Sequence, residues 1–192
     1  MRKLKLQMQM SLDGFVSTGS NDEQLWVTWA WDEIRTHVLK LLDSSDTILI
    51  GRKLAVDYIP YWLDVYTRPD DPMYPAARGI VKAKKIIFTK TLEKSDWDNT
   101  WLAKGGLVDE VIKLKSQDGQ DIIVYGGTSF VSALIREELI DEFHFFINPV
   151  VLGHGESVFS RLIDVRQLTL KHSIVYNCGI ILLQYEPKSF KI

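Results

Sequence analysis

The sequence has very little cysteine, and this scarcity limits both its chemistry and its location. Cys178 is the single cysteine among 192 residues. An internal disulfide is therefore excluded, as is any site built from several thiolates of one chain. The first ten residues carry positive charge but alternate apolar and polar side chains, unlike the apolar core of a secretion signal. These features favour a reducing compartment, and we expect the protein to be cytoplasmic.

Long apolar runs and an excess of one charge are also missing. A membrane-spanning helix needs about 20 consecutive apolar residues, whereas the most apolar segment, Phe143 to Leu152, is short and contains Asn148 and Pro149. Lys and Arg number 23 against 25 Asp and Glu, so the net charge of −2 provides no field that attracts a nucleic acid. We predict one folded domain over residues 1–192, with no membrane and no nucleic-acid partner.

Several motifs of known chemistry do not occur. The dinucleotide fingerprint Gly-x-Gly-x-x-Gly is missing, as are the phosphate-binding Gly-x-x-x-x-Gly-Lys-Ser/Thr and the hydrolase motif Gly-x-Ser-x-Gly. The four histidines, His37, His144, His154 and His172, are scattered without the spacing of metal ligands. We therefore predict that the protein has no metal site.

What the sequence does contain is an alternation of strand and helix patterns. Strands are predicted at 4–10, 47–50, 85–89, 100–102, 122–125 and 142–152, and helices at 31–42, at 107–114 and after residue 128. Residues 167–176 and 180–186 predict an antiparallel hairpin closed by Asn177-Cys178-Gly179. Pro69, Pro72 and Pro75 predict a long surface loop. The pattern indicates an α/β fold with a mostly parallel, twisted sheet that helices cover on both faces and that ends in an antiparallel C-terminal hairpin.

Ligands of such sheets bind at the carboxyl ends of the strands, and two of these ends carry phosphate-binding features. Gly126, Gly127, Thr128 and Ser129 follow one buried strand, where glycines allow close approach and a helix start favours an anion. Gly51, Arg52 and Lys53 follow another strand and add permanent positive charge. Each segment alone has a simpler interpretation. The first could be a tight turn with Thr128 as an ordinary helix N-cap, and the second could be a basic pair exposed to solvent. Two such corners in one sheet favour a ligand with more than one phosphate.

Tryptophans are concentrated just before the first predicted helix. Trp26, Trp29 and Trp31 lie within six positions and could form a wall for a flat heteroaromatic ligand, although packing is the commoner use of this residue. Asp32 and Glu33 are the nearest carboxylates that could face a ring nitrogen. The alternative is that both acids simply complement the helix dipole.

Six ordered motifs together resemble a known family. They are Ser11-Leu12-Asp13-Gly14-Phe15, Ile50-Gly51-Arg52-Lys53, Thr89-Lys90-Thr91-Leu92, Gly126-Gly127-Thr128-Ser129-Phe130, Leu139-Ile140-Asp141-Glu142 and Pro149-Val150-Val151-Leu152-Gly153-His154-Gly155. Nearly the whole chain resembles the dihydrofolate reductase-like superfamily. It is most similar to the reductase domain of the bifunctional riboflavin-biosynthesis deaminase-reductase.

The resemblance implies a dihydrofolate reductase-like fold, NADPH as hydride donor and a homodimer. It places Gly51, Arg52 and Lys53 near the cofactor's phosphates, Thr89 and Lys90 near its adenosine end, and Gly126 through Phe130 at its pyrophosphate. Asp13 and Gly14 would lie near the nicotinamide, and Asp13 is the predicted residue to relay or orient a proton. The apolar strand Phe143 to Leu152 is also compatible with a dimer, although a monomer could equally bury it.

The sequence departs from this family at positions that concern the substrate. Tyr125 stands where riboflavin reductases tend to carry a glutamate, Leu54 replaces a common threonine, and Arg35 falls near the acid expected for folate. We predict an NADPH-dependent reductase of a small pterin- or pyrimidine-like ring, with Trp26, Asp32 and Tyr125 at the substrate. The alternative is a non-catalytic module on the same fold that binds a nucleotide or a drug-like ring.

Overall fold

The computed structural model describes residues 1–19 and 22–188, which form thirteen helices and strands. In chain order these are β1 (Leu4–Ser11), α1 (Trp31–Asp43), β2 (Ser45–Gly51), α2 (Arg52–Tyr66), α3 (Tyr74–Lys82), β3 (Lys84–Phe88), β4 (Thr100–Ala103), α4 (Leu107–Ser116), β5 (Asp121–Gly126), α5 (Thr128–Arg136), β6 (Glu142–Asn148), β7 (Leu168–Val175) and β8 (Ile181–Pro187).

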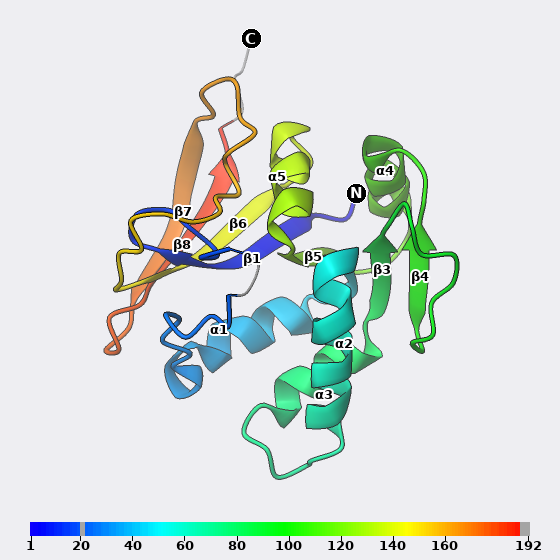
Figure 1. The fold of residues 1–192 in the computed structure, drawn as a ribbon, viewed down its shortest axis with the longest axis horizontal. Coiled ribbons are helices and arrows are strands. Elements are labelled where there is room, and N and C mark those ends of the chain that lie inside the picture. Colours follow the sequence, from blue (N-terminus) through cyan, green and yellow to red (C-terminus); the bar gives the residue numbers. More distant parts are fainter. Residues whose placement is uncertain (20–21, 189–192) are drawn as a thin grey trace.

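All eight strands form one sheet, in the order β4-β3-β2-β5-β1-β6-β8-β7 (Figure 1). The six strands from β4 to β6 are mutually parallel, whereas β8 runs antiparallel to β6 and pairs with β7 as a hairpin. The predicted fold class, a mostly parallel sheet with an antiparallel C-terminal hairpin, is therefore confirmed.

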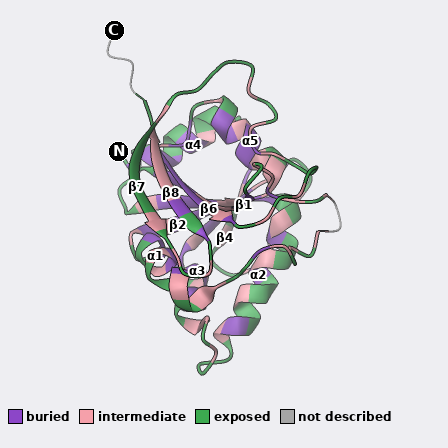
Figure 2. Cartoon of the chain, turned by 90° about the vertical axis from the view of Figure 1, so that its left-hand side faces the viewer, coloured by how far each residue is buried: buried purple, intermediate pink, exposed green. Residues whose placement is uncertain are grey.

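Helices cover both faces of the parallel part of the sheet. One buried cluster joins α4 and α5 to one face through residues such as Val111 and Leu134, and a second joins α1 and α3 to the other through Ile34 and Ile80. Figure 2 shows the resulting buried layer across the central strands, with exposed residues on the outer strand β7. Central strands buried on both faces need an uninterrupted apolar run, which is why β5 contains Ile-Ile-Val.

Two local expectations are corrected by the structure. The proline-rich segment is a loop only over residues 67–73, because Pro75 lies in the first turn of α3, where its missing N–H has no helical partner to lose. The strand predicted to reach residue 152 ends at Asn148. The side-chain amide of this buried asparagine donates to Gln9 Oε1 at 2.9 Å, and its oxygen accepts from the Thr28 amide at 2.9 Å, so it joins the strand end to the preceding loop.

The apolar character of β6 has an explanation within one chain. Phe143, Phe145 and Phe146 are 5%, 4% and 0% exposed, and contribute to the two main buried clusters. This strand therefore offers no free apolar face for a second copy. Among the described residues, none of the helices is long and apolar enough to cross a membrane.

Candidate functional site

The two glycine corners predicted from the sequence lie side by side. Strands β2 and β5 are neighbours, and Ile50 is paired with Gly126 at their carboxyl ends. A Cβ atom on Gly51 would lie 3.2 Å from the backbone nitrogen of Gly127 and 3.2 Å from Cβ of Phe130. Glycine at position 51 thus allows the two strand ends to approach each other, and the corners form one surface.

The two helices that start at this surface, α2 and α5, begin in a way that suits an anion. Both α2 and α5 have glycine N-caps, Gly51 and Gly127, without a side-chain cap, and neither has an acidic residue in its first turn. By contrast, α1 and α4 each carry two acids there. Free amides and the positive dipole end are consequently uncompensated at α2 and α5, where Thr128 and Ser129 begin α5.

The space in front of this surface is open, and its charge is positive. No atom lies within 4 Å of the place a Cβ of Gly127 would occupy. Arg52, Lys53 and Lys90 are exposed at the ends of β2 and β3, and none of them takes part in an ion pair with the part of the chain that the structure describes. These residues fit a phosphate-bearing cofactor by charge and by shape.

Two of the predicted cofactor residues have structural partners of their own. The hydroxyl of Thr89 accepts hydrogen bonds from the amides of Thr91 and Leu92 at 3.1 and 3.0 Å, and so holds the turn after β3. The ring of Phe130 packs on Phe88 with 4.8 Å between centroids. Phe130 therefore joins the start of α5 to the end of β3, and its side chain also lies against Gly51.

Asp13 lies after β1, where it holds two loops together. Its carboxylate accepts from the Ser11 hydroxyl at 2.7 Å, the Leu152 amide at 3.1 Å and the Gly153 amide at 2.7 Å. The hydrogen bond from Ser11 and those from the two amides lower the pKa of Asp13 to about 2, against a smaller opposing effect of desolvation. Asp13 is thus ionised near neutral pH and poorly suited to donate a proton. The neighbouring Gly14 supplies the positive φ of 88° that this turn requires.

The two loops that meet at Asp13 also pair further along. Ser17 and Glu156 form an antiparallel bridge, and the Val16 amide donates to the Glu156 carbonyl at 2.9 Å. Between them, Gly155 has a φ of 155°, and a Cβ there would lie 2.3 Å from the Ser17 carbonyl oxygen. The sequence signal for this contact was the segment Gly153-His154-Gly155, which the family resemblance included without giving it a role.

The tryptophans divide between a cavity and a loop. An open cavity of about 540 Å³ lies between the start of α1 and the α2–α3 loop. Its lining consists of Trp29, Ala30, Trp31, Asp32, Glu33, Asp71, Pro72 and Met73. Trp26, the tryptophan predicted to bind substrate, lies outside this lining and donates its indole N–H to Asp22 at 3.1 Å.

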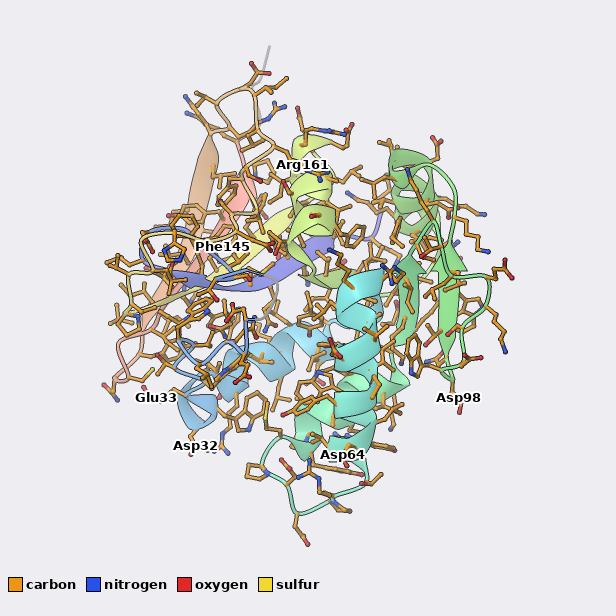
Figure 3. The ribbon with its side chains drawn as sticks, viewed as in Figure 1. Asp32, Glu33, Asp64, Asp98, Phe145 and Arg161 are labelled. Carbon is orange, nitrogen blue, oxygen red and sulfur yellow. The ribbon has the colours of Figure 1, made fainter. Side chains whose placement is uncertain are left out.

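Asp32 and Glu33, the adjacent acids of α1, have different environments, although the sequence analysis gave both the same candidate role. The side chain of Asp32 is 90% exposed, with Arg35 at 3.8 Å as a loose partner. Glu33 instead accepts from the Asn177 amide at 2.6 Å and so holds the turn of the β7–β8 hairpin. Figure 3 labels both residues in the first turn of α1. Asp32 is therefore the acid of the pair with free hydrogen-bonding capacity.

Tyr125 faces a second tyrosine that the sequence analysis missed. Its ring lies 5.5 Å from that of Tyr58 on α2, and both hydroxyl oxygens are buried without a hydrogen-bond partner among the described residues. Burial raises the pKa of both phenols, so each keeps its proton. A usable signal was the i, i+4 pair of aromatics Tyr58 and Trp62, which indicates one aromatic face of a helix. The two hydroxyls also influence each other's pKa, and both oxygens are enclosed, so a ligand reaches one of them only if a neighbouring side chain moves.

Three comparisons place the chain among known proteins. The model of the RibD C-terminal domain family matches residues 2–182. The chain belongs to this family. The uncharacterized protein YyaP of Bacillus subtilis is 33% identical over 190 residues, which is 96% of this chain and 94% of YyaP.

Solved structures agree with this assignment at the level of the fold. The Thermotoga maritima diaminohydroxyphosphoribosylaminopyrimidine deaminase/5-amino-6-(5-phosphoribosylamino)uracil reductase matches with a TM-score of 0.69 and 19% identity, over 97% of this chain and 57% of that one. Enterococcus faecalis dihydrofolate reductase complexed with NADP(H) matches with a TM-score of 0.62 and 11% identity, over 97% of both chains. This member of the RibD C-terminal domain family therefore has a dihydrofolate reductase-like fold.

Within the described residues, no group of three or more His, Cys, Asp or Glu side chains is placed to hold a metal ion.

Proposed function

We propose that this RibD-type domain is an NADPH-dependent reductase that transfers hydride to a C=N or C=O carbon of a small pterin- or pyrimidine-like ring. The observation that supports this most directly is the junction of Gly51 with Gly127 beside the exposed Arg52 and Lys53. Two glycine corners and two bases on one surface provide for a ligand with several phosphates.

In this proposal each part of the surface has one task. The glycines at 126 and 127 let the cofactor's pyrophosphate approach the backbone, and the amides of Thr128 and Ser129 donate to it. Arg52 and Lys53 neutralise phosphate charge, and Lys90 does the same near the adenosine end. Bound NADPH supplies the hydride, whereas the chain supplies orientation and exclusion of water.

The residues near the reacting rings act by position. Asp13, ionised and bonded to the amides of Leu152 and Gly153, holds the loop that borders the nicotinamide site. Tyr125 and Tyr58 carry protonated hydroxyls, and a movement that uncovers one of them would let it donate to an acceptor atom of the substrate ring. With Asp13 in this role, the rate should show no titration of that carboxylate between pH 5 and 8.

The decisive experiment is a titration with NADPH, followed by tryptophan fluorescence, and then by absorbance after addition of dihydrofolate or a pyrimidine substrate. We expect saturable NADPH binding, preference over NADH, and oxidation with at least one ring substrate. Equal affinity for the two cofactors would argue against the assignment of Arg52 and Lys53, and failure to bind NADPH would reject the proposed function.

A non-catalytic nucleotide-binding module is the second candidate, and the state of Asp13 favours it. The proton relay predicted from the sequence lies on a carboxylate with a pKa of about 2 that three donors already occupy. Saturable NADPH binding without oxidation by any pterin, pyrimidine or imine would support this candidate. Turnover with any of them excludes it.

A further inference from the structure

Strands β1 and β6 lie side by side, and each ends in a polar residue that is fully buried. Ser11 and Asn148 are both 0% exposed and are paired in register across the two strands. They lie at the carboxyl edge of the sheet, the edge at which Gly51 and Gly127 meet. A buried polar side chain is tolerated only where its hydrogen bonds are made within the protein, and it then fixes the groups that it contacts.

Asn148 uses both ends of its side-chain amide. The nitrogen donates to Gln9 Oε1 at 2.9 Å and to the carbonyls of Phe146 and Met10 at 3.2 and 3.4 Å. The oxygen accepts from the backbone amide of Thr28 at 2.9 Å. All four partners are uncharged, so the position suits a neutral amide and would make an ionised side chain costly.

These hydrogen bonds join two segments that lead to different parts of the proposed site. The nitrogen fixes the end of β1, and the chain continues from there into Asp13 and the loop that borders the proposed nicotinamide site. The oxygen fixes Thr28, and the residues that follow, Ala30 and Trp31, pack against the same buried cluster as Tyr125. Because Tyr125 is on the substrate side of the proposed site, one amide group joins the cofactor side to the substrate side.

We propose that Asn148 is a positioning residue of the reductase, which sets the distance and angle between the nicotinamide and the ring that accepts its hydride. This role rests on the proposed function. Asn148 contacts neither reactant in it, and acts through the backbone of β1 and of Thr28. A misplacement of about 1 Å can lower the rate of a reaction about a hundredfold, so a residue that fixes two binding segments relative to each other controls the rate more than the affinity.

Asn148→Ala removes all four hydrogen bonds and is the main test. Steady-state kinetics are measured with NADPH and two probes, dihydrofolate and 5-amino-6-(5-phosphoribosylamino)uracil, at a temperature at which circular dichroism shows the full-length variant to be folded. We expect kcat to fall about tenfold or more, while the Kd of NADPH, measured by tryptophan fluorescence, stays within about twofold because the glycine corners are unchanged. With NADPH deuterated at the transferred position, the isotope effect on kcat should increase, because hydride transfer becomes slow relative to product release.

Asn148→Asp has the same size as the native side chain and tests the hydrogen bonds one end at a time. The ionised carboxyl group can accept from Thr28 but cannot donate to Gln9, whereas the protonated form can do both. Burial among uncharged partners raises the pKa of the new carboxyl group. We therefore expect kcat, relative to the unmodified protein, to recover as the pH falls from about 8 to about 6. A residue that only stabilised the fold would give no such recovery of kcat.

Asn99→Asp is the matched control at the opposite edge of the sheet. The side-chain amide of Asn99 donates to the carbonyls of Lys82 and Ala83 at 2.8 and 2.9 Å, and so joins the start of β4 to the end of α3. The substitution removes the same donor atom far from the proposed site. It should lower the midpoint of urea denaturation and leave kcat and its pH profile unchanged.

An unchanged kcat in Asn148→Ala would overturn this role, as would an equal loss of kcat in Asn99→Asp. A loss of turnover that weaker NADPH binding accounts for, or a kcat of Asn148→Asp that does not recover at lower pH, would also overturn it. A failure of the proposed function is seen separately, in an unmodified protein that binds no NADPH or reduces neither probe, and this role would then fail with it.

Discussion

The amino and carboxyl edges of the parallel sheet handle charge in opposite ways. At the amino edge four cations are paired: Lys3 lies 2.6 Å from Glu142, Lys5 2.7 Å from Asp121 and Lys115 2.5 Å from Asp141, while Arg2 pairs with Asp46. At the carboxyl edge Arg52, Lys53 and Lys90 are exposed and have no such partners in residues 1–19 and 22–188.

Lys85 is an example of a cation near the amino edge whose hydrogen bonds are all made within the protein. This buried lysine lies in β3, and its ammonium donates to the carbonyls of Val81 and Ala83, both at 2.9 Å, and of Ile80 at 3.2 Å. Burial lowers its pKa to about 8. The ammonium of Lys85 is fully occupied by backbone carbonyls and has no capacity left for a ligand, whereas the exposed cations of the other edge do little for stability. The difference distinguishes a structural edge from a binding edge.

The largest effect is expected from breaking the amino edge. Asp141→Ala removes the partner of Lys115, whose side chain is 11% exposed, and an acceptor of the Leu4 amide at 2.7 Å. An uncompensated buried charge should lower the free energy of unfolding by about 3 kcal/mol. Urea denaturation measures the loss. NADPH affinity, measured under conditions where the variant is folded, should not change. A large change would mean that the amino edge also contributes to binding.

Removing charge from the carboxyl edge should give the converse result. Arg52→Ala is expected to weaken NADPH about tenfold and to narrow its advantage over NADH, because a phosphate loses its charged partner. The free energy of unfolding should stay within about 0.5 kcal/mol, as for other exposed substitutions. Fluorescence titration and urea denaturation provide the two readings, with Lys113→Ala on the exposed side of α4 as control. If both variants lost NADPH affinity equally, the effect would come from the net charge of the protein and not from a contact of Arg52.

A histidine pair extends the polar contacts of the amino edge under α1. His37 Nε2 lies 3.1 Å from His144 Nδ1, and His144 Nε2 lies 3.2 Å from Glu142. Burial lowers the pKa of His37 to about 4, with smaller contributions from His144, Lys40 and His172. The folded protein thus binds this proton more weakly than the unfolded chain does.

Stability should consequently fall as the pH drops from about 6.5 toward 4. Because His37 is partly exposed, we expect a loss of about 1 kcal/mol rather than the full value of the shift. His37→Gln should remove that part of the pH dependence, which denaturation at pH 7 and pH 5 would reveal. An unchanged pH profile in the variant would assign the effect to other groups.

No loss of stability is expected from removing a hydroxyl of the tyrosine pair. Tyr125→Phe deletes a buried hydroxyl without a partner, so the free energy of unfolding should stay constant or rise by up to about 1 kcal/mol. Substrate affinity should fall if this hydroxyl donates to the ring, with NADPH affinity unaltered. Val124→Ala in the same strand is a control that should lose stability by cavity formation instead. A stability loss in Tyr125→Phe would mean that the hydroxyl has a structural partner.

Much of the fold was readable from local pattern. The period-two segment of β1 and the apolar run of β5 were both sufficient to predict strands. The burial of β1 does not alternate, however, because β1 lies between β5 and β6 and its Lys5 is buried beside Asp121. The α1 pattern predicted a helix over 31–42, and the helix spans 31–43. The α3 helix was missed because Pro72 and Pro75 were interpreted as loop residues, although Pro75 occupies the one helical turn that tolerates proline.

The sequence by itself determined the alternation of strands and helices, the glycines at the strand ends and membership of the RibD family, because these depend on neighbouring residues and on ordered motifs. Only the tertiary structure decided that β2 lies beside β5, that Glu33 holds a hairpin while Asp32 stays free, and that Tyr58 meets Tyr125. Those contacts join residues far apart in the chain, and they form only when both faces of the sheet are buried together.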